Sequence, residues 1–249
     1  MLTHVMYEKT CALLVVLVLT ATASARAAVS DAELTRNIQR QLSNLDYGSR
    51  RPVVTVKDAV VTITGTVSTL WLKEETINHV LKAEGLESIV SELTIPRAES
   101  DDKLAAQVVD TIRHYALFTL YDDFQGRVKN GIVYIGGAVT EPKKLTDIVE
   151  RIAKVKGVQA IDNKVTVLPA NQSDDRLRVQ IASAIYNLQE FERYSMADPP
   201  IHVIVKNGRV TLIGIVRADI EKFKALEAAR FVEGILSVED RIQLAKNVK

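Results

Sequence analysis

Histidine is the side chain best suited to metal binding or proton transfer at neutral pH. Beyond residue 27 it occurs as His79, His114 and His202, which are far apart in the sequence. Metal sites draw on clustered ligands, and nucleophilic catalysis needs a nucleophile, a base and a group that orients the base. The serines and carboxylates are scattered without such a grouping. We therefore expect no metal, no cofactor and no enzymatic activity.

Nucleotide and nucleic-acid chemistry are also disfavoured. The chain has 32 basic and 31 acidic residues, a formal net charge of +1, and so lacks the basic excess typical of nucleic-acid-binding proteins. Gly136 and Gly137 lie in a strand-like repeat and do not form a phosphate loop that opens a helix. The single cysteine, Cys11, lies near the amino terminus, so the rest of the chain can form no disulfide or thiolate site.

Two local features are suited to binding. Trp71, in STLWLKEE, is flanked by leucines and could insert into a membrane interface, or it could pack on a neighbouring part of the chain. A basic helical stretch could face anionic lipid headgroups, or it could be a solvated face that forms ion pairs. Its basic residues are Lys143, Lys144, Arg151, Lys154 and Lys156.

The amino terminus predicts a cleaved signal peptide over residues 1–27. Lys9 precedes the apolar run CALLVVLVL, and small residues follow, with cleavage expected before Ala28. The apolar run is too short for a bilayer-spanning helix, which needs about 20 residues. We therefore expect an exported, periplasmic chain with no transmembrane span after cleavage.

The strongest pattern is a threefold repeat. VKDAVVTITGTV, VKNGIVYIGGAV and VKNGRVTLIGIV each end near a glycine, and a second glycine follows 20 residues later in every copy. Ser-Asp pairs at residues 30, 100 and 173 precede apolar residues spaced by four, which predicts capped amphipathic helices. We expect structural roles for these paired glycines: Gly65 and Gly85, Gly137 and Gly157, and Gly214 and Gly234.

Each copy is predicted to fold as helix–strand–strand–helix–strand. Asn-Gly between the first two strands favours a tight hairpin turn in copies two and three. Ala59 replaces glycine in copy one, which predicts a different turn there. The first glycine of each pair should let a helix backbone pass close to the sheet, and the second should end the helix.

The fold class is therefore α+β, with three tandem αββαβ domains, each placing two helices on one face of a mixed three-stranded sheet. The opposite sheet faces of copies two and three carry apolar residues that we expect to be covered by one another or by a partner. These residues are Ile132, Tyr134, Ile213 and Ile215.

The serine-capped helix, the VKNGxVxLxGxV hairpin and the closing GVxxIxNxVxV strand together resemble the BON domain of bacterial osmotic-stress and nodulation proteins. The resemblance covers nearly all of residues 30–245 as three tandem copies, and we expect the domains at residues 28–97, 98–170 and 171–249. It implies a non-enzymatic envelope protein, similar to osmotically inducible periplasmic proteins, that binds phospholipid or other envelope components. The alternatives are a chaperone that shields unfolded clients on its apolar sheet faces, and a scaffold that docks on envelope proteins.

Overall fold

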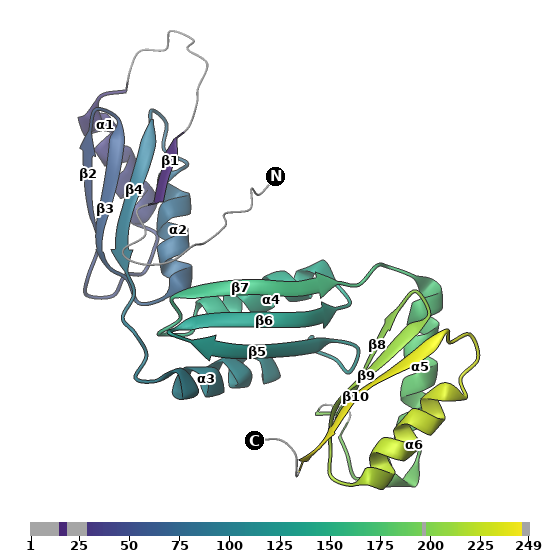
Figure 1. The fold of residues 1–249 in the computed structure, drawn as a ribbon. Coiled ribbons are helices and arrows are strands. Elements are labelled where there is room, and N and C mark those ends of the chain that lie inside the picture. Colours follow the sequence, from purple (N-terminus) through teal and green to yellow (C-terminus); the bar gives the residue numbers. More distant parts are fainter. Residues whose placement is uncertain (1–14, 19–28, 196–197, 246–249) are drawn as a thin grey trace. The chain divides into compact units, whose positions relative to one another are not determined.

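The computed structural model describes residues 15–18, 29–195 and 198–245. The same order of elements, helix–strand–strand–helix–strand, occurs three times (Figure 1). The first repeat contains α1 (Asp31–Leu42), β2 (Val53–Lys57), β3 (Val60–Thr66), α2 (Leu70–Val80) and β4 (Ser88–Thr94). The second contains α3 (Asp101–Arg113), β5 (Asp123–Lys129), β6 (Ile132–Val139), α4 (Pro142–Ala153) and β7 (Ala160–Val167). The third contains α5 (Gln172–Tyr186), the 3-10 turn η1 (Gln189–Phe191), β8 (Ile201–Lys206), β9 (Arg209–Val216), α6 (Asp219–Arg230) and β10 (Ser237–Leu244).

The repeats are distributed over two compact units. The first unit holds the first repeat together with Ala153–Ala160. The second unit holds Ser100–Ile152 and the residues from Ile161 onward, so the second and third repeats share one unit.

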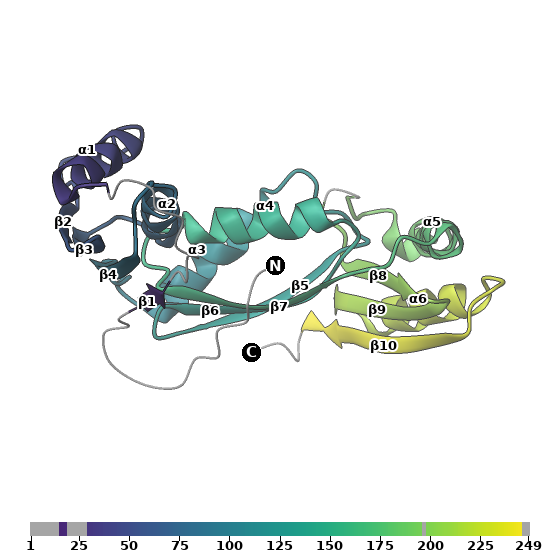
Figure 2. The same cartoon turned by 90° about the horizontal axis from the view of Figure 1, so that it is seen from above.

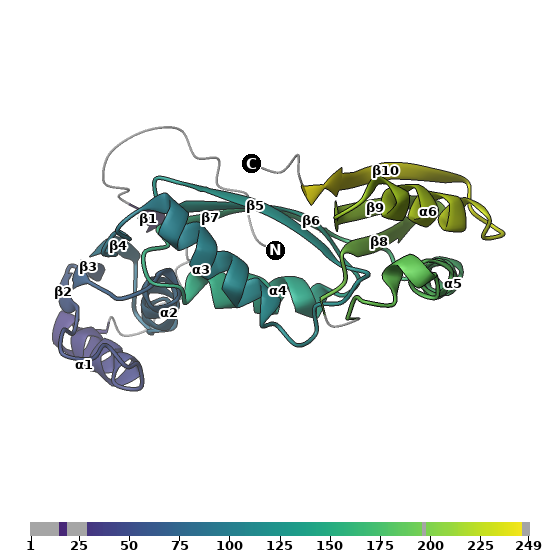
Figure 3. The same ribbon diagram turned by 90° about the horizontal axis from the view of Figure 1, so that it is seen from below.

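Each repeat builds a mixed sheet. In the first and third repeats the hairpin strands pair antiparallel and the last strand joins the middle one in parallel. Figures 2 and 3 show α3 and α4 on the same face of the sheet β5–β6–β7. The predicted αββαβ fold is confirmed.

One strand falls within the predicted signal peptide. β1 (Val15–Val18) pairs antiparallel with β4, so the first sheet has four strands in the order β1-β4-β3-β2. The rest of that segment, residues 1–14 and 19–28, lies outside the described residues.

The first helix of each repeat is capped at its start and buries one stripe. Ser30 and Ser100 accept hydrogen bonds from the backbone N–H groups of Glu33 and Lys103, as predicted. In the third repeat Asn171, not Ser173, is the capping residue, because α5 begins earlier than the pattern suggested. The residues with spacing of four that are buried by these helices are Leu34, Ile38 and Leu42, then Leu104 and Val108, then Leu177, Ile181 and Ile185.

The aspartate beside each predicted capping serine holds the hairpin turn of its own repeat. The carboxylate of Asp101 accepts hydrogen bonds from the backbone N–H groups of Asn130 and Gly131, at 2.6 and 2.9 Å. Asp31 and Asp174 make the equivalent pairs of bonds in the first and third repeats. This contact links the Ser-Asp pair of each repeat to its hairpin turn, two features that the sequence presented separately.

The first hairpin uses the same turn as the others. Asp58 and Ala59 have φ of 51° and 60°, close to the 54° and 76° of Asn130 and Gly131. The prediction of a different turn was therefore wrong. The two hydrogen bonds to Asp31 hold the alanine in a conformation that costs an L-residue about 1–2 kcal/mol.

In the second and third repeats the first glycine of the pair is required by a neighbouring strand and not by a helix, whereas a Cβ on Gly65 would lie 3.3 Å from the Cα of Pro52. A Cβ on Gly137 would lie 2.1 Å from the carbonyl oxygen of Asp123, and one on Gly214 would lie 1.9 Å from that of Pro200. Both oxygens belong to the chain entering the first hairpin strand. These glycines have the structural role that we expected. The backbone that passes close to them belongs to a strand, however, and not to a helix as we predicted.

The second glycine of each pair follows its helix at a distance. α2, α4 and α6 end at Val80, Ala153 and Arg230, four or five residues before Gly85, Gly157 and Gly234. These glycines have φ of 88°, 96° and 88° and turn the chain toward the last strand. They are not the helix caps that the pattern suggested.

Candidate functional site

The predicted basic face is divided by the structure into residues with different roles. Lys144 is only 5% exposed, and its Nζ lies 2.7 Å from the Oδ2 atom of Asp122, which is fully buried. Lys144 therefore cannot reach a lipid headgroup, which corrects its assignment to the lipid-facing surface. Its position on the buried side of α4 depends on an ion-pair partner 22 residues earlier in the chain.

Asp122 is the centre of a saturated hydrogen-bond network. Besides Lys144, its carboxylate accepts from the backbone N–H and the hydroxyl of both Thr119 and Thr140. Burial alone would raise the pKa of Asp122, but the bonds from Lys144, Thr140 and Thr119 outweigh it and hold that pKa below its usual value. A buried charge of this kind is stable only while every partner is present. The network joins the segment before β5 to the start of α4.

Two further basic residues of α4 are exposed but already have intramolecular contacts. Lys143 donates to Asp147 across one helical turn at 2.6 Å. The Arg151 guanidinium lies 5.0 Å from the ring centroid of Tyr115, whose hydroxyl also donates to Asp147. Burial, followed by this hydrogen bond to Asp147, raises the pKa of Tyr115 to about 12.

In the first unit the structure brings together two features that the sequence presented separately. The Nζ atom of Lys154 lies 4.7 Å from the centroid of the Trp71 ring. Trp71 is half-buried, whereas Lys154 and Lys156 are exposed. A lysine over a tryptophan ring gains a cation–π attraction of about 0.5–1 kcal/mol at an exposed site. Trp71 and Lys154 thus form an aromatic and cationic pair on the surface of the first unit.

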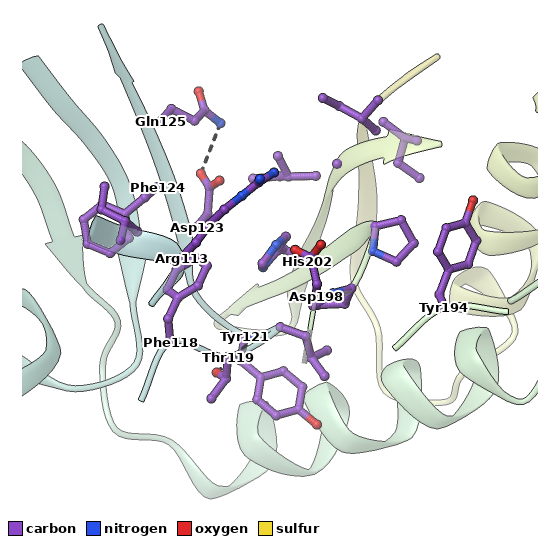
Figure 4. Close-up of a pocket in the computed structure, with 18 of the residues that line it drawn as sticks. Arg113, Phe118, Thr119, Tyr121, Asp123, Phe124, Gln125, Tyr194, Asp198 and His202 are labelled. Atoms are coloured by element: carbon purple, nitrogen blue, oxygen red, sulfur yellow. Dashed lines mark hydrogen bonds between the residues drawn. The ribbon is translucent and has the colours of Figure 1, made fainter. Parts of the chain in front are cut away.

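Within the second unit a loop of the second repeat is built into the third. Leu120 is buried in the apolar core of the third repeat, and its carbonyl accepts from the backbone N–H of Val203 at 2.7 Å. Beside this joint lies an open cleft of about 1510 Å³, larger than the roughly 300–1,000 Å³ of most small-molecule sites. Aromatic residues line it, among them Phe118, Tyr121 and Phe124 (Figure 4).

His202 lies in this cleft against the loop of the second repeat. Its ring centroid is 5.4 Å from that of Phe118, and its Nδ1 is buried without a hydrogen-bond partner among the described residues. Burial lowers the pKa of His202, although the charge of Asp123 opposes the shift. Burial also raises the pKa of Asp123, which accepts from Gln125 (Figure 4). The arrangement responds to pH, but it offers no nucleophile next to a base.

Comparison with known proteins places these repeats in a family. The model of the BON domain matches residues 30–97, 100–169 and 173–246. The chain belongs to the BON domain family. BON domains are non-catalytic and are associated with interaction with membranes and the cell envelope. A comparison with curated proteins gives no match.

Two similar solved structures are of CdsD, a structural protein of the Type III secretion system of Chlamydia trachomatis. One is 16% identical, covers 85% of this chain and 92% of its own, and has a TM-score of 0.25. The other, the C-terminal domain, is 16% identical, covers 87% and 99%, and has a TM-score of 0.26. Scores this low carry no argument about arrangement or function.

The apolar sheet faces of the second and third BON domains are only partly covered by one another. Ile204 is buried with Ala138 and Leu168 of the second domain, and Ile213 packs against them. Ile215 stays 49% exposed. On the second sheet the Arg127 guanidinium covers the Tyr134 ring at 4.0 Å, while Ile132 is half-buried. The contact therefore joins the third sheet to strand ends of the second domain.

Sequence reasoning missed an apolar surface on the third BON domain. Four large apolar side chains there are exposed by 51%, 59%, 81% and 71%: Ile220, Phe223, Phe231 and Leu236. A comparison of equivalent positions among the three domains could have identified them from the sequence.

Across the described ranges no group of three or more histidine, cysteine or acidic side chains could hold a metal ion. The helices in those ranges are all too short or too polar to span a bilayer.

Proposed function

We propose that this protein is a non-enzymatic component of the periplasmic envelope that binds anionic phospholipid surfaces through its BON domains. The observation that carries the proposal is the 4.7 Å approach of Lys154 to the Trp71 ring in the first unit. Tryptophan is favoured where one side of a site is apolar and the other is wet. A basic residue near an anionic membrane contributes about 1 kcal/mol to binding.

Export is part of the proposal and rests on the predicted signal peptide. Cleavage before Ala28 would remove β1, whose partner is β4. The first BON domain would then keep β2, β3 and β4, the same three-stranded sheet that the other two domains have. An osmotic-stress role in the envelope fits such a chain.

Vesicle flotation of the chain that begins at Ala28 tests the lipid interaction. We expect binding to phosphatidylglycerol vesicles to fall when Lys154 and Lys156 are changed to glutamate, and to fall again with Trp71→Ala. Lys57→Glu is the matched control, because Lys57 lies at the β2–β3 turn of the same unit, at the end of β3 away from Trp71. Equal flotation of the wild type and the Lys154/Lys156 variant would refute the assignment of this site.

A chaperone that shields unfolded clients is the second candidate. The exposed Ile215 favours it, but Ile213 and Ile204 already pack against the second BON domain. The two functions differ in their response to salt, because lipid binding through basic residues weakens as ions screen them. Protection of an aggregating client that is lost with Ile215→Ser and is insensitive to salt would favour the chaperone.

A further inference from the structure

The third BON domain differs from the other two at four exposed positions. Counting 6, 9, 17 and 22 residues beyond the first glycine of the pair gives Ile220, Phe223, Phe231 and Leu236 in this domain. The same positions are Trp71, Glu74, Lys82 and Glu87 in the first domain, and Lys143, Thr146, Lys154 and Gln159 in the second. Because the fold accepts lysine, threonine and glutamine at these positions, it does not require the apolar side chains of the third domain.

We call the surface that carries Ile220, Phe223, Phe231 and Leu236 the apolar edge of the third domain. Ile220, Phe223 and Phe231 recur at a spacing of three and then eight residues, which places them on the same side of α6. Phe231 follows the last helical residue, and Leu236 ends the same short connection before β10. The backbone N–H of Leu236 donates to Gly208, so this connection lies beside the β8–β9 turn.

Three exposed basic residues lie beside this edge, together with the exposed carboxylates of Glu233 and Asp219. Lys206 and Arg209 flank the turn that Leu236 contacts, and Arg230 precedes Phe231; all three are exposed. Within the described ranges no ion pair engages them. The nearby carboxylate of Glu227 is neutralised by Lys224 at 2.9 Å, and that of Glu221 is buried against Arg193. Exposed aromatic and aliphatic side chains with three basic residues beside them fit a negatively charged apolar boundary.

We infer that the apolar edge of the third domain inserts into the interface of an anionic phospholipid membrane, with Lys206, Arg209 and Arg230 contacting headgroups. The proposed function supplies the kind of partner, while the surface is separate from Trp71 and Lys154. The edge lies outside the cleft beside His202. Exposed side chains spread over a helix and the following connection suit a fluid partner that rearranges around them.

A single-tryptophan reporter tests insertion directly. The chain contains one tryptophan, so Trp71→Phe with Phe231→Trp leaves one indole, at the apolar edge. In the chain that begins at Ala28, vesicles of phosphatidylglycerol and phosphatidylcholine should shift its emission to the blue, and lipids brominated in the acyl chain should quench it. An unshifted emission under conditions where the reporter itself floats with the vesicles would overturn the inference and leave the proposed function standing.

Substitution of the edge measures its contribution. Phe223→Thr and Leu236→Gln introduce the residues that stand at the equivalent positions of the second domain. Phe231→Gln introduces a polar residue without changing the charge. We expect the triple variant to fold. Its affinity for anionic vesicles should fall at least about tenfold. Neutralising Lys206, Arg209 and Arg230 to glutamine should cost about fivefold each, which corresponds to about 1 kcal/mol per basic residue.

Val179→Gln is the matched control, because Val179 is exposed on α5 of the same domain, outside the apolar edge. Unchanged vesicle affinity of the triple variant would contradict the inference. Crosslinking in cells provides a second readout: a protein crosslink that the triple variant loses while its vesicle affinity stays intact would show that the edge docks a protein, which also overturns the inference. No flotation of the wild type would reject both the inference and the proposed function.

Discussion

Lys143 and Lys144 are adjacent in the sequence but experience opposite environments. Lys143 is exposed and pairs with Asp147 on the helix surface, whereas Lys144 is buried against Asp122. Removing one partner of a buried ion pair leaves an uncompensated charge, whereas an exposed pair contributes little. The same chemical change should therefore give different results at these two residues.

We predict that Lys144→Ala lowers the free energy of unfolding by about 3 kcal/mol or more. Lys143→Ala should leave the urea midpoint close to that of the wild type. Urea denaturation followed by circular dichroism compares the two variants. Similar midpoints for both would mean that the Asp122 network does not support the fold.

His202 should make the second unit sensitive to mild acid. The pKa of His202 is lower in the folded protein than in the unfolded chain, so the unfolded chain binds a proton on this side chain at a higher pH. The folded state therefore loses stability as the pH falls below about 6.5, the usual pKa of histidine. The groups that face His202 are the Asp123 and Asp122 carboxylates and the backbone of Asp122 and Thr119, all of which favour its protonated form, but burial outweighs them. The raised pKa of Asp123 acts in the opposite direction at lower pH.

We predict that His202→Phe reduces the loss of stability between about pH 7.5 and about pH 5.5, which can reach about 1.4 kcal/mol per pH unit for one group. Urea denaturation at both pH values measures it. His114→Gln is the comparison variant, because the His114 side chain is 76% exposed. An equal pH dependence in the wild type and His202→Phe would assign the effect to other groups.

At the level of elements, the aspartate clamp on each hairpin explains why one turn type occurs three times. Its carboxylates accept two turn N–H groups in every domain, including the turn that contains Ala59. The alanine is strained there, and glycine would not be.

We predict that Ala59→Gly stabilises the first domain by about 1 kcal/mol and slows exchange of the β3 amide hydrogens by about fivefold. Gly131→Ala should do the reverse in the second domain. Hydrogen exchange resolves the two domains separately. Faster exchange in Ala59→Gly would show that the φ of Ala59 carries no strain.

The elements that the sequence predicted are those set by local pattern. The stripe of Leu34, Ile38 and Leu42 and the capping by Ser30 depend on residues close in the chain. The missed features depend on distant partners: Asp101 contacts a turn 29 residues away, and Lys144 meets Asp122 22 residues before it. Lys144 lies four residues before Ile148, on the face of α4 that the apolar stripe buries, but its partner Asp122 is too distant in the chain for a local pattern to reveal. Trp71 and Lys154 were each identified, but not their contact.

At the scale of the molecule, the second and third domains form one unit because Leu120 completes a core that is not its own. A residue of the second domain should therefore control the stability of the third. We predict that Leu120→Ala costs about 2–5 kcal/mol and speeds exchange of the β8 amides. Leu117→Ala, in the same loop but 48% exposed, is the control. Unchanged β8 exchange in Leu120→Ala would mean that the two domains fold independently.

We propose that the protein, once exported, acts as a passive contact surface for anionic lipid. Flotation of the chain from Ala28 with phosphatidylglycerol vesicles, compared with pure phosphatidylcholine vesicles, tests it most directly. We predict recovery with the anionic vesicles only, and a steep decrease between about 0.05 M and about 0.5 M salt as the charges are screened. Equal recovery with both lipids, or none with either, would contradict the account.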